Sequence, residues 1–114
     1  MKELNAVVKD LYSFLDEKQA EDVIVYDVDG KNPETDYIVL STARNNRHLS
    51  ALSRDADDFL TKAGYELRGR EGDPESGWIL MDFNDLVLHL FVEEQRSYYH
   101  LERLCNSYSV LLES

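Results

Sequence analysis

The stretch GWILMDFNDLVLHLF, from Gly77 to Phe91, consists of two apolar runs separated by a short polar break. Two runs of strand-forming residues around a tight break predict a β-hairpin, here with Phe83 and Asn84 as its two-residue loop. Successive side chains of a strand point to opposite faces. One face of the hairpin is therefore expected to be apolar and to belong to the core, with Ile79, Met81, Leu86, Leu88 and Leu90.

The opposite face of this hairpin is mixed in character. Its expected cross-strand pairs are Asp82 with Asp85, Leu80 with Val87, and Trp78 with His89. A tryptophan on a half-polar face is either a flank of the core or an anchor for a protein partner, because aromatic residues ringed by polar groups are typical of interface hot spots. The residues alone leave both roles of Trp78 open.

The two aspartates and the histidine allow three interpretations. They could bind a divalent cation, although His89 would lie about 13 Å along the strand from Asp85 at roughly 3.3 Å per residue. The two carboxylates could share a proton as an acid–base pair, through like-charge repulsion. They could instead be turn residues that accept backbone N–H hydrogen bonds, and a position at a hairpin tip favours this last interpretation.

Composition limits the class of protein and of partner. The 114 residues correspond to one domain, and 43% hydrophobic residues suffice for a modest core. The net charge of −11 repels phosphate backbones and favours a basic protein partner. A single cysteine, Cys105, excludes an internal disulfide and fits a reducing cytosol. The N-terminal stretch is broken by charges, unlike a signal peptide, and no apolar run approaches the length of a membrane span.

Hydrophobic periodicity predicts one α/β domain with the element order α-β-β-α-β-β-β-α. The sheet is expected to be mixed, with about five strands and flanking helices. The near-continuous apolar run at 36–42 predicts a central strand. Asn45 or Asn46 is expected to cap the second helix, and Gly64 to end it. The remaining elements are a first helix over positions 4–15, strands at 22–28, 65–71, 78–83 and 85–92, a last helix at 93–108, and a C-terminal tail at 109–114.

Other stretches offer little chemistry. The helix start at 43–50 carries Arg44, Arg47 and His48 and could attract a phosphate, but no glycine-rich loop accompanies it, so salt bridges or helix contacts are expected instead. His100 and Cys105 lie on different faces of a helix and do not form a nucleophile pair. The residues alone therefore indicate a small acidic α/β domain that binds a protein and is not an enzyme.

Two segments carry a more specific pattern. DVDGKNPETDYIVLSTARNNRH, at 27–48, has Asp-x-x-Gly, a turn, Asp-Tyr, an apolar strand ending in Thr, and Arg-His at a helix start. REGDPESGWILMDFNDLVLHLFVEEQRSYYHLERL, at 70–104, has Glu-Gly, a loop, Trp, a strand with Asp, a tight turn with Asp, then His-x-Phe, Arg, Tyr and Leu-Glu. Both patterns resemble the ribosomal silencing factor family, also called the Iojap-like family. The resemblance spans roughly residues 3–105, and we expect a silencing domain over 1–108.

The resemblance implies a function without catalysis. Family members bind the large-subunit ribosomal protein uL14, block joining to the small subunit and so repress translation in the cytoplasm. The implied fold is nucleotidyltransferase-like without the catalytic glycine-serine and metal-carboxylate signature, which this sequence also lacks, so no enzyme activity, cofactor or metal is expected. No direct sequence-specific binding of nucleic acid is expected either. A nucleotidyltransferase-like enzyme and a homodimeric assembly module, paired through exposed strand edges, are the alternatives.

The resemblance also assigns the binding residues. Trp78 aligns with the family's tryptophan and is implied to lie in the ribosomal-protein interface, with Glu71, Asp82, Asp85 and Tyr98 as contacts or supports. Two positions depart from the family pattern. Ala43 replaces a glycine, which questions a close backbone turn there, and Cys105 replaces a common tryptophan, which suggests weaker packing or contact by the last helix.

Overall fold

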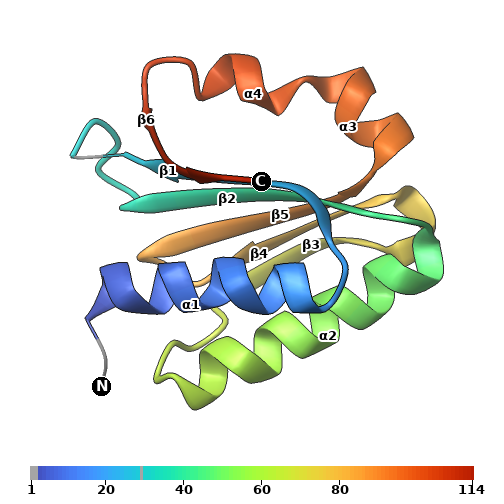
Figure 1. Cartoon of the computed structure of the whole chain (residues 1–114), viewed down its shortest axis with the longest axis horizontal. Helices are drawn as coiled ribbons and strands as arrows, with labels where there is room; N and C mark the ends of the chain where they lie inside the picture. The colour runs from blue at the N-terminus through green and yellow to red at the C-terminus, as the bar shows by residue number, and fades with distance from the viewer. Residues whose placement is uncertain (1–2, 29) are drawn as a thin grey trace.

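The computed structural model describes residues 3–28 and 30–114, and these form a six-stranded sheet with helices on both faces (Figure 1). The strand order across the sheet is β3-β4-β5-β2-β1-β6. Only the central pair, β2 and β5, is parallel; the other neighbouring strands are antiparallel. The strands are β1 (Glu21–Asp27), β2 (Tyr37–Ala43), β3 (Gly69–Asp73), β4 (Trp78–Asp82), β5 (Leu86–Val92) and β6 (Ser109–Glu113). The predicted mixed α/β class is confirmed, with six strands in place of about five.

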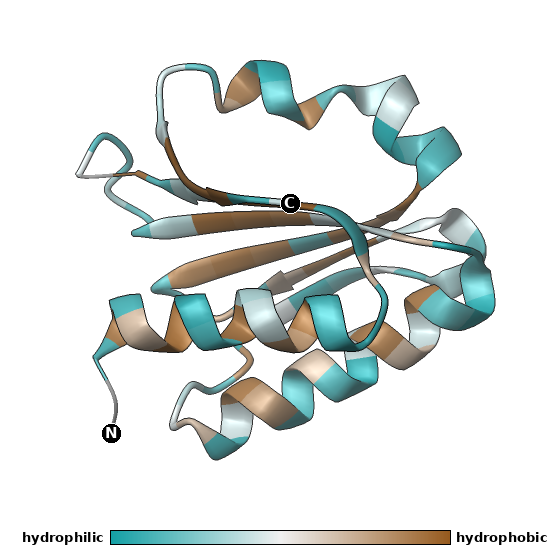
Figure 2. Ribbon diagram, viewed as in Figure 1, coloured by the Kyte–Doolittle hydropathy of each residue, from teal (hydrophilic) through white to brown (hydrophobic). Residues whose placement is uncertain are grey.

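Helices α1 (Leu4–Glu17) and α2 (Asn46–Lys62) cover one face of the sheet side by side (Figure 1). The predicted caps of α2 are confirmed: the Asn45 side chain accepts a 2.8 Å hydrogen bond from the His48 backbone N–H, and Gly64 follows the helix at φ +96°. Each helix turns its apolar side chains toward the strands (Figure 2). No helix in the described part of the chain combines the length and apolar character that a bilayer crossing needs.

Strand β2 lies at the centre of the sheet, as its apolar run predicts. Every residue of β2 is buried except Ile38, which is half-buried. Hydrogen bonding to β1 on one side and β5 on the other satisfies its backbone groups, so an apolar run can be buried there at low cost.

The hairpin of β4 and β5 forms in a different register from the predicted one. Trp78 pairs with Phe91 rather than His89, and Asp82 pairs with Val87 rather than Asp85. The shift is two residues, so every side chain keeps its face. The five residues expected in the core are all fully buried: Ile79, Met81, Leu86, Leu88 and Leu90.

The reason for the register shift lies in the loop. Phe83 is buried in the main core, and its backbone N–H donates to the Leu86 carbonyl oxygen over 2.9 Å. Asn84 adopts a left-handed conformation at φ +70°. Burying the Phe83 ring lengthens the connection to three residues, Phe83 to Asp85, and removes Asp85 from the ladder.

Strand β3 begins four residues later than predicted. Tyr65 is buried and Leu67 is half-buried against the core, and this alternation mimics a strand. Neither residue has a ladder partner, because pairing starts at Gly69, opposite Asp82. Positions 72–77, between the strands expected at 65–71 and 78–83, accordingly contain the end of β3 and a single 3₁₀ turn, η1 (Pro74–Ser76).

The prediction of one helix over 93–108 is wrong. The segment contains two short helices, α3 (Glu93–Tyr99) and α4 (Leu101–Leu104), separated by His100 at φ +50°. No glycine or proline marks this break. The buried Arg96 guanidinium ties α3 to the sheet through the Asp22 carbonyl oxygen (2.6 Å) and the Thr42 hydroxyl (2.8 Å), and a straight helix would carry the chain away from the sheet.

The segment expected to be a C-terminal tail contains the sixth strand. β6 pairs with β1 at the edge of the sheet, and the Ser114 backbone N–H donates to the Val23 carbonyl oxygen over 2.9 Å. Ser109 and Val110 are exposed and the two leucines only half-buried. Such a short edge strand has little hydrophobic periodicity, and for this reason the sequence does not predict a strand here.

Candidate protein-binding face

The second face of the sheet is only partly covered, and Trp78 lies at the border between the part covered by α3 and α4 and the part left accessible. Helices α3 and α4 pack over Tyr26, Leu40 and Phe91. The β4–β5 half of this face remains half-buried, and we call it the open face, defined by Trp78, Leu80, Val87 and His89. Alternation along the hairpin predicts these residues to share one face, and in the structure they do.

Aromatic contacts and one hydrogen bond hold the Trp78 side chain. Its ring centroid lies 5.1 Å from that of Phe91 and 4.6 Å from that of Tyr99, which comes from the end of α3. Its Nε1–H donates to His89 Nδ1 over 3.2 Å. Trp78 is therefore held in one orientation while its side chain stays partly accessible, the combination expected of an interface anchor.

The state of His89 follows from its burial. Desolvation lowers the pKa of His89 from 6.5 to about 4, so the imidazole is neutral at neutral pH. A neutral imidazole that accepts at Nδ1 carries its proton on Nε2. His89 therefore acts as a hydrogen-bond acceptor that orients the tryptophan.

A cavity of about 230 Å³ opens beside Trp78, between β3, β4 and α3. Glu71 of β3 lies opposite Leu80 in the ladder, so its side chain shares the open face and reaches the rim of this cavity. Within residues 3–28 and 30–114, the Glu71 carboxylate has no hydrogen bond or ion pair. The lining residues are Glu71, Gly72, Ser76, Trp78, Leu80, Gln95 and Tyr99.

Asp82 ends β4, four residues from Trp78, which is about 13 Å at roughly 3.3 Å per residue, and Asp85 lies in the loop that follows. The Asp82 carboxylate accepts the backbone N–H of Asn84 over 2.7 Å, as expected of a turn residue. The Asp85 carboxylate accepts from the Asn84 side chain over 3.5 Å. These carboxylates form an acidic tip of the hairpin and do not meet the cavity.

Tyr98 lies outside the cavity. Its side chain is 76% exposed, and its ring packs edge-on against Tyr99 with centroids 5.0 Å apart. Of the five residues implied by the resemblance, the structure thus brings Trp78 and Glu71 together and places Tyr98 one ring further out. Asp82 and Asp85 stand apart at the hairpin tip.

Five further residues line the cavity and are not assigned to the binding site from the sequence: Gly72, Ser76, Leu80, Gln95 and Tyr99. Alternation already places Leu80 on the same face as Trp78, two residues along the strand. Tyr99 and Gln95 carry no such signal, because their positions depend on where α3 ends and how Arg96 fixes it to the sheet.

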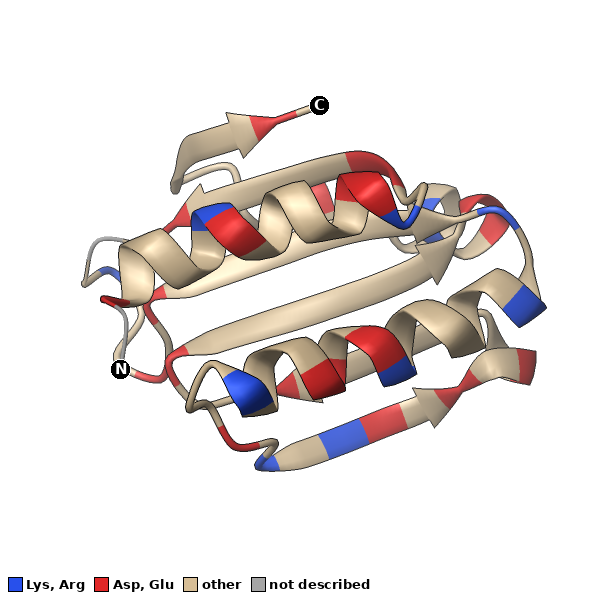
Figure 3. Ribbon diagram, turned by 60° about the horizontal axis from the view of Figure 1, so that its bottom comes forward, with Lys and Arg blue, Asp and Glu red and all other residues tan. Residues whose placement is uncertain are grey.

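The charges of the protein lie away from the centre of the sheet. The two central strands, β2 and β5, contain no lysine, arginine, aspartate or glutamate, and the charged residues lie on helices, turns and the other strands (Figure 3). An apolar centre with an acidic margin is suited to a basic protein surface and poorly suited to a nucleic-acid backbone.

Potential metal ligands and reactive side chains of the described residues include the histidines, the cysteine and the carboxylates. Among them, no group of three or more histidine, cysteine, aspartate or glutamate side chains is arranged to hold a metal ion. His48 is engaged by the backbone on both sides: Nδ1 accepts from the Arg44 N–H over 2.9 Å and Nε2 lies 2.8 Å from the Lys18 carbonyl oxygen. Burial raises the pKa of the Cys105 thiol to about 11, so this thiol is protonated and unreactive at neutral pH.

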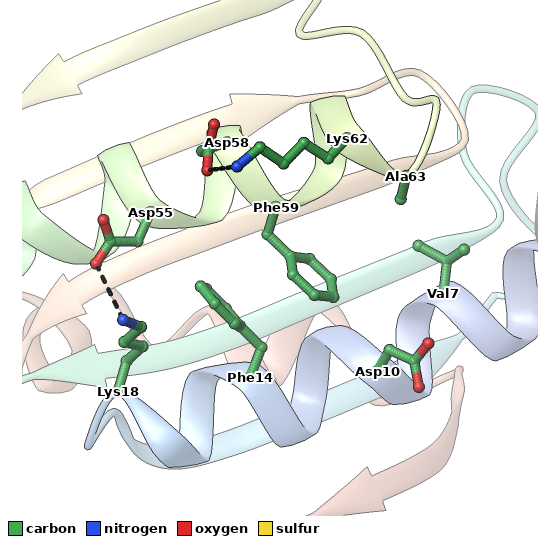
Figure 4. A pocket seen from close by; sticks show the side chains of 9 residues that line it. All are labelled: Val7, Asp10, Phe14, Lys18, Asp55, Asp58, Phe59, Lys62 and Ala63. Carbon is green, nitrogen blue, oxygen red and sulfur yellow. Dashed lines mark ion pairs between the residues drawn. The ribbon is translucent and has the colours of Figure 1, made fainter.

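A second, larger cavity lies on the opposite side of the molecule. It opens between α1 and α2 and has a volume of about 660 Å³. Its floor is the stacked pair of Phe14 and Phe59, with ring centroids 4.5 Å apart (Figure 4). Ion pairs hold both lysines of its rim: Lys18 lies 3.9 Å from Asp55, and Lys62 lies 3.0 Å from Asp58.

Comparisons with known proteins agree on one family. Residues 1–111 match the family model described as "Ribosomal silencing factor during starvation". The chain is 31% identical to the Bacillus subtilis ribosomal silencing factor over 87% of this chain and 84% of the relative. It is 34% identical to that of Haemophilus influenzae over 87% and 97%. A crystal structure of a Chromobacterium violaceum protein superposes with a TM-score of 0.85 at 27% identity, covering 92% of this chain and 88% of the other.

Proposed function

The chain belongs to the ribosomal silencing factor family, and from this membership we propose that it binds the large ribosomal subunit and represses translation by obstructing the small subunit. The proposed docking partner is the ribosomal protein uL14, and the proposed place of action is the cytoplasm. The mechanism is steric. It requires a stable complex on the subunit interface and no reaction, cofactor or metal.

The observation that carries this proposal is the placement of Trp78 on the open face. A half-buried tryptophan, oriented by His89, stacked on Phe91 and in contact with Tyr99, loses little side-chain entropy on binding. Burial of its remaining accessible area by a partner can therefore contribute to affinity at a small entropic cost. Removing such an anchor typically costs about 2 kcal/mol or more, which is roughly thirtyfold in affinity.

The acidic groups supply the second part of the proposed interface. Glu71 stands at the rim of the cavity, and Asp82 and Asp85 at the hairpin tip. Carboxylates at these positions would pair with lysines and arginines of a basic ribosomal protein. Charges at an interface rim mainly raise the association rate and set orientation.

The direct test is subunit joining followed by light scattering. Purified large and small subunits are mixed in magnesium after the large subunit has been incubated with the protein, and a Trp78→Ala variant is run alongside. The wild type is expected to suppress the rise in scattering, and the variant to need about thirtyfold more protein for the same effect. Phe14→Ala, which truncates an aromatic ring on the opposite helical layer, is the matched control and should behave as wild type. Joining unaffected by the wild type would contradict the proposal.

Two alternatives have their own tests. A homodimer is the second proposal, because β3 and β6 leave both edges of the sheet open to pairing. Sedimentation over a concentration series distinguishes a dimer from a monomer. Equilibrium binding of magnesium and nucleotides tests the nucleotidyltransferase-like alternative, for which the described residues offer no arranged group of metal ligands.

A further inference from the structure

The cavity beside Trp78 combines apolar walls with one carboxylate. Trp78, Leu80 and Tyr99 provide most of the apolar lining, and Gly72 allows the backbone of β3 to form part of the wall. Arg70, the neighbouring cation, does not enter this space. It projects to the other face of the sheet, where its guanidinium lies 3.3 Å from the Ser53 hydroxyl of α2.

Glu71 decides the charge of the occupant. Its carboxylate is exposed at the rim and has no partner within the part of the chain that the structure describes. A partner that covers the cavity with an apolar or acidic side chain would desolvate this carboxylate without compensation, which is unfavourable. A cationic head group at the rim would pair with it.

The size of the cavity decides the kind of occupant. Pockets for drug-sized ligands measure about 300–1,000 Å³, and this cavity of about 230 Å³ is smaller. It suits one long side chain, whose methylene stem lies along the apolar walls while its charge stays at the rim. The larger cavity in Figure 4 lacks this asymmetry, because both of its lysines are already paired with aspartates.

We propose that this cavity receives a single lysine or arginine side chain of a protein partner, with the stem against Trp78, Leu80 and Tyr99 and the cationic head paired with Glu71. The proposal rests on the function proposed above and makes it more specific. It separates the role of Glu71, inside the contact, from that of Asp82 and Asp85, which act at a distance from it.

The free protein allows a test that does not involve the ribosome. Trp78 is the only tryptophan of the chain, so indole fluorescence reports on this cavity alone. N-acetyl-lysine amide is titrated against the protein, with N-acetyl-norleucine amide, which keeps the stem and lacks the charge, as the matched probe. We expect saturable quenching by the lysine compound with a Kd on the order of millimolar, and binding at least about fivefold weaker for the norleucine compound.

Two variants assign the contact. Glu71→Gln should reduce the affinity for the lysine compound to that of the norleucine compound. Glu75→Gln removes the same charge from η1, outside the cavity lining, and should leave it unchanged. Equal affinities of the two compounds for the wild type, or equal effects of the two variants, would overturn the proposal.

The same pair of variants, measured on purified large subunits, separates the two proposals. We expect Glu71→Gln to weaken binding about tenfold and Glu75→Gln to change it less than twofold. If the wild type does not bind large subunits, the proposed function fails. If the wild type binds and Trp78→Ala weakens it, but the two glutamine variants behave alike, the function stands and the basic side-chain site is refuted.

Discussion

The burial of His89, which accepts the hydrogen bond from Trp78, makes the free energy of unfolding depend on pH. His89 must be neutral to accept at Nδ1, and burial lowers its pKa from 6.5 to about 4. Between these values the unfolded chain binds a proton that the native state excludes. The contribution of His89 to the free energy of unfolding is therefore constant above pH 6.5, falls as the pH is lowered toward 4, and does not change further below pH 4. Since the pKa falls from 6.5 to about 4, the total loss is about 3.5 kcal/mol at roughly 1.4 kcal/mol per tenfold change in proton affinity.

His89→Phe should remove this dependence. We expect a smaller fall in the free energy of unfolding between pH 6.5 and 4 for the variant than for the wild type, measured by urea denaturation at a series of pH values. Tryptophan fluorescence can follow both proteins, and the carboxylates that titrate in the same range contribute equally to both. Parallel curves for the two proteins would show that His89 is not held neutral by the fold.

Gly72 is the residue whose replacement should most damage the wall of the cavity. It adopts φ +84°, and a Cβ atom there would overlap the main-chain oxygen of Trp78. Gly72→Ala should therefore lower the free energy of unfolding by at least about 2 kcal/mol. Gly69, in the same strand, has open space around its Cα, and Gly69→Ala should change stability by no more than about 0.5 kcal/mol. Chemical denaturation of both variants checks the contrast, and similar losses would contradict it.

At the scale of elements, Arg96 fixes the short helices α3 and α4 to the sheet. Its side chain is 6% exposed and donates to the Asp22 carbonyl oxygen, the Thr42 hydroxyl and, over 3.3 Å, the Glu102 carboxylate. Arg96→Met keeps most of the volume and leaves these three acceptors without their donor. The expected loss is about 2–3 kcal/mol.

The loss should be local before it is global. Amides of α3 and α4 should exchange faster in Arg96→Met, and tryptophan emission should shift to longer wavelength as Tyr99 moves off Trp78. Arg103→Met, on the exposed side of α4, serves as the control and should show neither change. Unchanged exchange in Arg96→Met would mean that packing alone holds the two helices.

The same elements show how far the sequence could predict the fold. Long amphipathic segments such as α1 and α2, and a central strand with a near-continuous apolar run, are confirmed because burial alone dictates them. The hairpin faces are confirmed as well, whereas its register is wrong because a buried Phe83 outweighs ideal turn geometry. The break at His100 and the edge strand β6 depend on contacts between distant segments, and a single sequence does not display these.

The candidate site follows the same division. Trp78 and Glu71 could be chosen from the family resemblance, and the structure brings both to one cavity. Tyr99 could not be chosen, because only the end of α3 and its attachment through Arg96 decide which of two adjacent tyrosines faces Trp78. Residues that belong to the family pattern could therefore be chosen from the sequence, and residues placed by tertiary contacts could not.

At the scale of the whole molecule, the two faces of the sheet differ in what they offer a partner. One face is closed by α1 and α2, whose charged side chains include the Lys18–Asp55 and Lys62–Asp58 ion pairs. The other leaves an aromatic centre accessible beside unneutralised carboxylates. A net charge of −11 attracts any basic partner at long range, but only the open face would hold it at short range.

This asymmetry predicts how salt should affect binding to the large subunit. Affinity should fall as potassium chloride rises, because screening weakens attraction between the acidic protein and a basic partner. The double variant Asp82→Asn and Asp85→Asn keeps the acceptor oxygens of the turn and removes two charges from the hairpin tip. Its affinity should be lower at low salt and should fall less steeply as salt increases.

The matched control removes the same number of charges from the helical layer. Asp55→Asn with Asp58→Asn gives the same net charge as the hairpin variant, and the loss of three surface ion pairs, Asp55 with Lys18 and Arg54 and Asp58 with Lys62, should cost stability only about 0–1 kcal/mol each. Because α1 and α2 face away from the proposed interface, its salt dependence should match that of the wild type. Binding is measured by sedimentation with large subunits at a series of salt concentrations. Identical slopes for the two double variants would mean that net charge alone steers association and that the hairpin tip does not lie at the interface.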